Sequence, residues 1–157
     1  MLKLSTKRST MLSLVISVTF FVLCIAAVFF MPTVINMLID TPDNIGNRGD
    51  ITSAGRVYVH IISYILLAVF ILADVFNTFL LLRVRKGKVF TPISVSLIRY
   101  VSWCCMGVCL CFLLLGIYFQ LAFIMAFLAL FLSLCLRVVK NVIEEATEIK
   151  DENDLTV

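Results

Sequence analysis

Charged residues are scarce in this sequence, and their scarcity excludes several classes of protein. Charged residues make up 15% of the chain and hydrophobic residues 62%, whereas a soluble domain is typically about a quarter charged and about half apolar. A water-soluble globule of 157 residues with a mean hydropathy of +1.09 would leave much apolar surface in water. The same composition excludes intrinsic disorder and a secreted disulfide scaffold. An integral membrane protein with small aqueous parts remains.

Motifs that carry chemistry are also missing. The chain has one histidine, His60, whereas a haem held between helices usually takes two and an H-E-x-x-H zinc site requires two. The sequence contains no glycine-rich phosphate loop and no G-x-S-x-G nucleophile elbow. We therefore expect a protein that is not an enzyme, with no catalytic residues, no metal and no cofactor.

Four long apolar runs dominate what is present. They cover residues 11–31, 57–82, 95–117 and 121–139. A membrane-spanning helix needs about 20 mostly apolar residues to cross a hydrocarbon core of about 30 Å, and each run meets this requirement. Strands of a membrane barrel would alternate apolar and polar residues, which these runs do not. The first run is longer than the apolar part of a signal peptide and lacks a small-residue cleavage site, so we interpret it as a retained helix.

Basic residues predict how the runs are oriented. Eleven of the 13 lysines and arginines lie before the first run, between the second and third, at the start of the third (Arg99), or toward the chain end. The other two, Arg48 and Arg56, lie in the connection 40–56. Because basic loops stay in the cytoplasm, we expect one domain, 1–157, that is an all-α, up-down-up-down membrane four-helix bundle with both termini cytoplasmic. Residues 40–56 form its external loop and 83–92 its cytoplasmic loop.

Residues 140–157 are predicted to form a cytoplasmic amphipathic extension of the fourth helix. Apolar residues recur there at helical spacing, and carboxylates occupy another face. An acidic arm offers a contact for a basic cytoplasmic partner, although a solvated helix end would look the same. The candidate docking residues are Glu144, Glu145, Glu148, Asp151 and Glu152.

Asp74 is the most informative single residue, because ionisable groups at membrane depth usually face a partner or a cavity. It lies about two turns inside the cytoplasmic end of the second run, and Arg99 lies near the start of the third. We therefore expect an intramembrane pair of Asp74 and Arg99, with Asn77 or Arg137 nearby. Two alternatives stay open: Arg99 and Arg137 extend to the headgroups while Asp74 is protonated, or Asp74 belongs to a proton or ion pathway.

Small residues predict how the third and fourth runs pack. All six cysteines lie inside apolar runs without a C-x-x-C motif or a nearby histidine, so we interpret them as packing residues. Membrane helices associate where small side chains let their backbones approach. We expect two small-residue ridges to face each other or a common interior: Cys104, Gly107 and Cys111 on one helix, and Ala122, Ala126, Ala129 and Ser133 on the other.

Three local signals concern the helix ends. Pro32 predicts a kink or a stop near the end of the first helix. Thr91 is a candidate N-cap with Pro92 at the first helical position, and Ser94 is a competing cap. The connection 116–120 is so short that the third and fourth helices must be antiparallel neighbours.

Two segments resemble a known family. They are Gly87-Lys88-Val89-Phe90-Thr91-Pro92, which leads into Leu97-Ile98-Arg99-Tyr100, and the ending Glu152-Asn153-Asp154-Leu155-Thr156-Val157. Together with four apolar runs, they resemble the bacterial membrane family known as domain of unknown function 2975. The resemblance implies location in the bacterial inner membrane and no established activity. It also implies a partner, because members are often encoded beside a small helix-turn-helix regulator of the Cro/CI type.

These observations predict a regulatory or interaction role, such as docking that regulator, with no direct contact to nucleic acid. The lipid bilayer is the other expected partner. A small transporter or channel subunit that uses Asp74 is the alternative from a different class. Immunity to a membrane-active peptide is a third hypothesis.

Overall fold

The protein consists of four helices joined by short connections. The structure is a computed structural model that describes residues 6–40, 51–87 and 89–155. Its helices are α1 (Thr6–Asp40), α2 (Ser53–Arg85), α3 (Pro92–Leu115) and α4 (Leu121–Leu155). Each is long and apolar enough to cross a membrane. The chain is therefore a helical multi-pass membrane protein, as its composition predicts.

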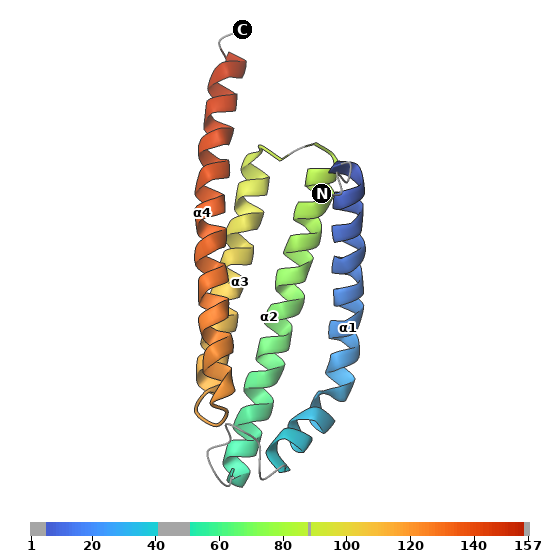
Figure 1. Ribbon diagram of the computed structural model, residues 1–157, viewed down its shortest axis with the longest axis vertical. Coiled ribbons are helices and arrows are strands. Elements are labelled where there is room, and N and C mark those ends of the chain that lie inside the picture. The colour runs from blue at the N-terminus through green and yellow to red at the C-terminus, as the bar shows by residue number, and fades with distance from the viewer. Residues whose placement is uncertain (1–5, 41–50, 88, 156–157) are drawn as a thin grey trace, which may run out of the picture.

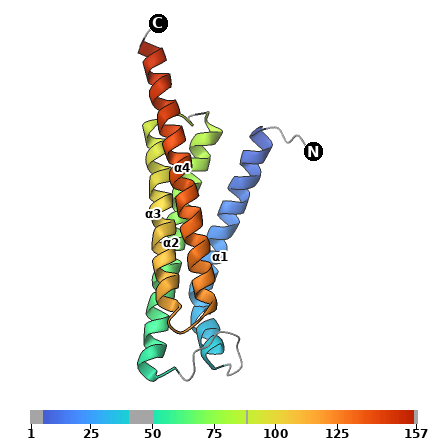
Figure 2. The ribbon, with the colours of Figure 1, turned by 60° about the vertical axis from the view of Figure 1, so that its left-hand side comes forward.

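The helices pack side by side in chain order. Consecutive helices run in opposite directions, so that the start of α1 and the ends of α2 and α4 lie at one end of the molecule (Figure 1). Within the described ranges, α1 packs only against α2, α2 packs also against α3, and α3 also against α4. The N-terminal part of α1 leans away from the other helices (Figure 2). The four helices thus form an open row, with α1 at one edge and α4 at the other.

A buried apolar cluster joins the helices at the opposite end of the molecule. The cluster contains Ile35 and Ile39 of α1, Val59 and Ile62 of α2, and Leu115 of α3, among others. Nearby, the Tyr58 hydroxyl donates a hydrogen bond to the carbonyl oxygen of Leu114 at 3.2 Å. Tyr58 also packs against the ring of Tyr118, with the centroids 5.7 Å apart. With Ala122 and Ala126 of α4 also in the cluster, residues of all four helices share one apolar core at this end.

The start of α3 matches the local signals of the sequence. The Thr91 hydroxyl accepts a hydrogen bond from the backbone N–H of Ser94, and Pro92 opens α3, which confirms Thr91 as the N-cap. The Ser94 hydroxyl instead bonds to the Thr91 hydroxyl at 2.9 Å. Gly87, with φ of +72°, forms the turn after α2, in a conformation that favours glycine.

Pro32 bends α1 without ending it. The helix continues to Asp40, and its last part turns away from the axis of the rest (Figure 1). A proline inside a helix removes one backbone hydrogen bond and kinks the axis. The bend lets Ile35 and Ile39, 3% and 8% exposed, reach the apolar cluster.

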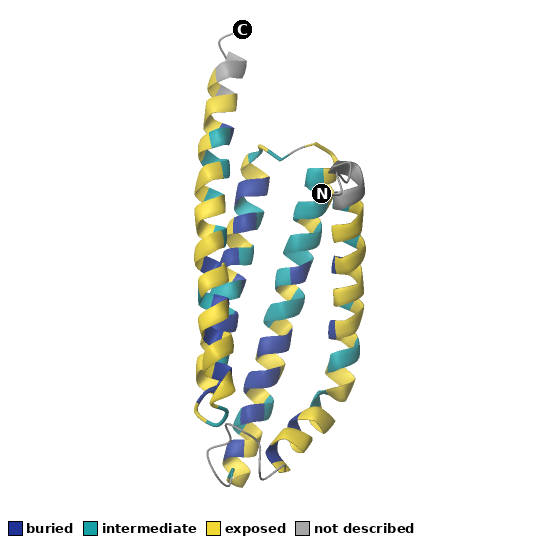
Figure 3. Ribbon diagram, in the orientation of Figure 1, coloured by how far each residue is buried: buried dark blue, intermediate teal, exposed yellow. Residues whose placement is uncertain are grey.

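Large apolar side chains cover the outside of the molecule. Phe29, Met37 and Phe127 are each at least 70% exposed. Exposed residues run along α1 and α4 for most of their lengths, whereas buried residues concentrate where α2 and α3 meet their neighbours (Figure 3). Lipid tails solvate such surfaces, so helix association depends on close packing and hydrogen bonds.

Candidate functional site

Asp74 lies at the interface between α1 and α2 and is 7% exposed. The Ser17 hydroxyl donates to Asp74 Oδ1 at 2.7 Å, and the Ser17 and Thr78 hydroxyl oxygens lie 2.8 Å apart. Because a hydroxyl has one proton to give, Thr78 donates to Ser17, which donates to Asp74. Among the described residues, nothing hydrogen-bonds to the buried Oδ2 atom of Asp74. The hydrogen-bonded series Thr78–Ser17–Asp74, here called the polar chain, thus leaves the Oδ2 atom of Asp74 for a proton or another ligand.

A groove of about 580 Å³ lies beside this carboxyl group. Residues of α1 and α2 form most of its walls, including Ser13, Asp74 and Asn77, and Val101 of α3 closes one side. The N-terminal part of α1, which leans away from the other helices in Figure 2, supplies Ser13, Ser17 and Phe20 to the groove wall. Ser13, Ser17 and Asn77 are polar neighbours of the Asp74 carboxyl group in this groove. Ionisable side chains are rare at this depth in a membrane protein.

The structure does not bring Asp74 and Arg99 together, so the predicted pair is wrong. Arg99 lies on the side of α3 that faces α4, and its Nη2 atom lies 3.3 Å from Glu144 Oε1. Asp74 faces α1, where the Ser17 hydroxyl donates a hydrogen bond to its Oδ1 atom. The prediction considered depth but had no information on which side of each helix faces which neighbour.

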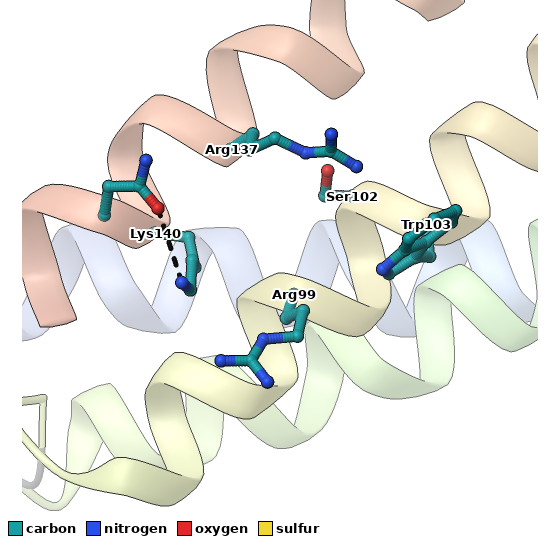
Figure 4. Close-up of a pocket in the computed structure, with 6 residues that line it drawn as sticks. Arg99, Ser102, Trp103, Arg137 and Lys140 are labelled. Atoms are coloured by element: carbon teal, nitrogen blue, oxygen red, sulfur yellow. Dashed lines mark hydrogen bonds between the residues drawn. The ribbon is translucent and has the colours of Figure 1, made fainter.

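Three cations lie between α3 and α4: Arg99 and Lys140 both bond to Glu144, and Arg137 points away from them toward Trp103. Arg99, Arg137 and Lys140 line a shallow pocket of about 290 Å³ together with Ser102, Trp103 and Asn141 (Figure 4). The Arg137 guanidinium carbon lies 5.4 Å from the centroid of the Trp103 ring, a cation–π distance. Lys140 donates to Asn141 Oδ1 at 3.3 Å and also bonds to Glu144, four residues along the same helix.

The extension of α4 carries the predicted acidic arm beyond the rest of the molecule. The helix runs past the C-terminal end of α2 and the N-terminal end of α3 (Figure 1). Glu144 turns inward to Arg99 and Lys140, whereas Glu145, Glu148 and Glu152 are exposed. These three are spaced i, i+3 and i+7, so they form one acidic strip. The side chain of Asp151 lies outside the described residues.

The predicted small-residue ridges are buried, but a different pair links α3 to α4. Ala122, Ala126, Ala129 and Ser133 all face the interior of the row, as do Cys104 and Cys111. Gly107 instead faces α2, because a Cβ atom there would lie 3.6 Å from Val69. Ser102, which sequence reasoning missed, lies opposite Ser133: each hydroxyl donates to the other residue's carbonyl oxygen, at 3.0 and 2.9 Å. A serine on each helix at matching depth was the signal available.

The six cysteines are free thiols, four of them buried. In the part of the chain that the structure describes, no three metal-binding side chains cluster. His60 bonds through Nδ1 to the Arg56 carbonyl oxygen of its own helix, at 2.9 Å.

Comparison with known proteins yields one family. The profile described as Protein of unknown function (DUF2975) matches residues 44–157, which confirms the resemblance drawn from the motifs. Comparisons with curated proteins and with solved structures give no match.

Proposed function

Because the chain belongs to the family Protein of unknown function (DUF2975), we propose for it a non-enzymatic role in the bacterial inner membrane: its α4 extension docks a small, basic helix-turn-helix regulator. In this proposal α1 to α4 cross the membrane up and down, and both termini are cytoplasmic. The basic residues at one end of the molecule support that orientation. The regulator class comes from the family resemblance.

The observation that carries the proposal is the exposed acidic strip of Glu145, Glu148 and Glu152, on the part of α4 that projects beyond its neighbours. Val142 and Ile149, 60% and 54% exposed, lie next to the strip at helical spacing. Residues 140–157 contain six carboxylates and two lysines. A surface with apolar and acidic residues side by side complements a basic protein and steers its approach.

Charge reversal on the strip is expected to weaken docking. We expect a helix-turn-helix gene beside the gene for this chain, and its purified product to bind the detergent-solubilised full chain. The double variant Glu145→Lys, Glu148→Lys should raise Kd about tenfold, because two attractive contacts become repulsive. Titration of the labelled regulator measures this. Glu144 stays unchanged in the variant, so its bonds to Arg99 and Lys140 persist.

The matched control is Lys150→Glu, which adds negative charge to the same exposed stretch of α4. It should bind the regulator at least as tightly as the natural chain. If the regulator binds the lysine variant unchanged, or does not bind the natural chain, the docking proposal fails.

The Asp74 groove favours a second candidate, a small transporter or channel subunit. This buried carboxyl group, which among the described residues has a hydrogen bond to Oδ1 alone, lies beside a groove of about 580 Å³ and has the features of an intramembrane proton or ion site. Transport would use protonation or cation binding at the Oδ2 atom.

Proton flux into vesicles of phosphatidylethanolamine and phosphatidylglycerol, followed with an enclosed pH dye, tests this candidate. Asp74→Asn should reduce the flux to the level of empty vesicles, because an amide side chain does not take up and release a proton at the pH of the experiment. Asp74→Glu should retain part of it. Equal flux from the natural chain and Asp74→Asn, with both folded, would rule out the candidate.

A further inference from the structure

We propose that the pocket between α3 and α4 binds the phosphate group of an anionic phospholipid. Arg99, Arg137 and Lys140 line this pocket from two antiparallel helices, with Arg99 and Lys140 on one side of it and Arg137 directed toward Trp103 on the other (Figure 4). Guanidinium groups recognise phosphate oxygens through paired hydrogen bonds, and an ammonium group adds a compact positive charge. The site is independent of the docking role.

The charge in the pocket is incompletely neutralised. Glu144 is the one carboxylate bonded to these cations within the described residues, and it contacts Arg99 and Lys140. The Arg137 guanidinium group lies over the Trp103 ring. Three cations against one carboxylate leave two positive charges in the pocket. A phosphodiester group carries one negative charge, so the pocket can neutralise it. Ser102 and Asn141 add polar groups to the wall.

The position of the pocket favours a lipid over a soluble anion. Arg99 lies seven residues into α3, about 10 Å from its first residue, within the depth of the headgroups and upper chains. Trp103 is 60% exposed, as expected of an aromatic side chain at the membrane interface. Toward the membrane centre, Met106 and Leu110 follow Trp103 on one face at i+3 and i+7. This apolar face can take the acyl chain below a bound phosphate.

Trp103 provides the test, because it is the one tryptophan in the chain. The full chain is placed in phosphatidylcholine vesicles that contain equal mole fractions of either brominated phosphatidylglycerol or brominated phosphatidylcholine. Bromine quenches tryptophan at short range. We expect the relative association constant to favour phosphatidylglycerol about fivefold or more, which corresponds to one or more basic contacts. Equal quenching by the two lipids would overturn the proposal.

Variants locate the effect. Arg137→Gln and Lys140→Gln should each bring the ratio of the two lipids toward one. The ratio is taken within a single variant, so a shift of the Trp103 ring affects both lipids alike. Arg85→Gln, a cation at the end of α2 that does not line the pocket, should keep the natural ratio. If both pocket variants keep the natural preference for phosphatidylglycerol, the lipid does not bind at this pocket and the proposal is wrong.

Soluble phosphate distinguishes the two sources of the same chemical group. Inorganic phosphate added at about 10 mM, which would fill most of a weak site with a Kd of about 1 mM, should leave the quenching by brominated phosphatidylglycerol unchanged. If inorganic phosphate displaces the lipid, the pocket is a general phosphate site and the lipid assignment is wrong.

Discussion

Substitution of Ser133 by leucine is expected to lower the free energy of unfolding by about 2 to 4 kcal/mol. Ser133 is 1% exposed and lies against α3, where its hydroxyl and carbonyl both bond to Ser102. Leucine removes the hydroxyl and forces a larger side chain between two backbones in close contact. Unfolding in detergent mixtures, followed by circular dichroism, measures the loss.

The control for this prediction is Cys135→Leu, two residues further along α4. Cys135 is exposed on the lipid side of the helix, so leucine there should change the free energy by less than about 0.5 kcal/mol. If both variants lose the same free energy of unfolding, then helix propensity or membrane insertion, which leucine changes at either position, determines the loss. Packing at the Ser102–Ser133 contact would then not explain how α3 and α4 associate.

Ser17→Ala is expected to lower the free energy of unfolding by about 1 to 3 kcal/mol, because it leaves a buried carboxyl group without its hydrogen-bond donor. Ser17 connects Thr78 to Asp74 across the α1–α2 contact. Since Ile35 and Ile39 hold only the last part of α1 in the apolar cluster, loss of this link should also loosen the N-terminal part of α1 from α2. Limited proteolysis, run beside the unfolding measurement, detects the loosened part.

A second substitution makes this prediction sharper. Adding Asp74→Leu to Ser17→Ala should recover most of the lost stability, because the unsatisfied polar group is then gone. Thr19→Ala is the matched control, since that exposed hydroxyl bonds to Val15 within its own helix. A loss in Thr19→Ala equal to that in Ser17→Ala would contradict a specific role for the polar chain.

The elements of this fold could be predicted from the sequence because the membrane imposes a simple rule. A helix that must cross about 30 Å of hydrocarbon shows itself as a long apolar run, whatever its neighbours. Thr91 and Pro92 gave the start of α3 for a similarly local reason, the free N–H groups of a first turn. Such signals do not depend on where the other helices lie.

Contacts between helices could not be predicted in the same way. Asp74 and Arg99 lie on neighbouring helices, but they face different partners, α1 and α4. Which face of an apolar helix is turned inward depends on packing against all its neighbours, and lipid-exposed and buried positions here are both apolar. The Ser102–Ser133 pair and the link from Ser17 to Asp74 were missed for that reason. Glu144 was assigned to docking, whereas its partners Arg99 and Lys140 draw it inward.

The orientation of the chain in the membrane decides whether the acidic strip and the cationic pocket can meet cytoplasmic partners and lipids. Alkaline phosphatase and green fluorescent protein fused in turn to each terminus, and to Asn47 between α1 and α2, report it. We expect fluorescence at both termini and phosphatase activity at Asn47, because the basic residues hold the chain ends inside. Phosphatase activity at either terminus, or fluorescence at Asn47, would contradict a four-span protein with cytoplasmic ends.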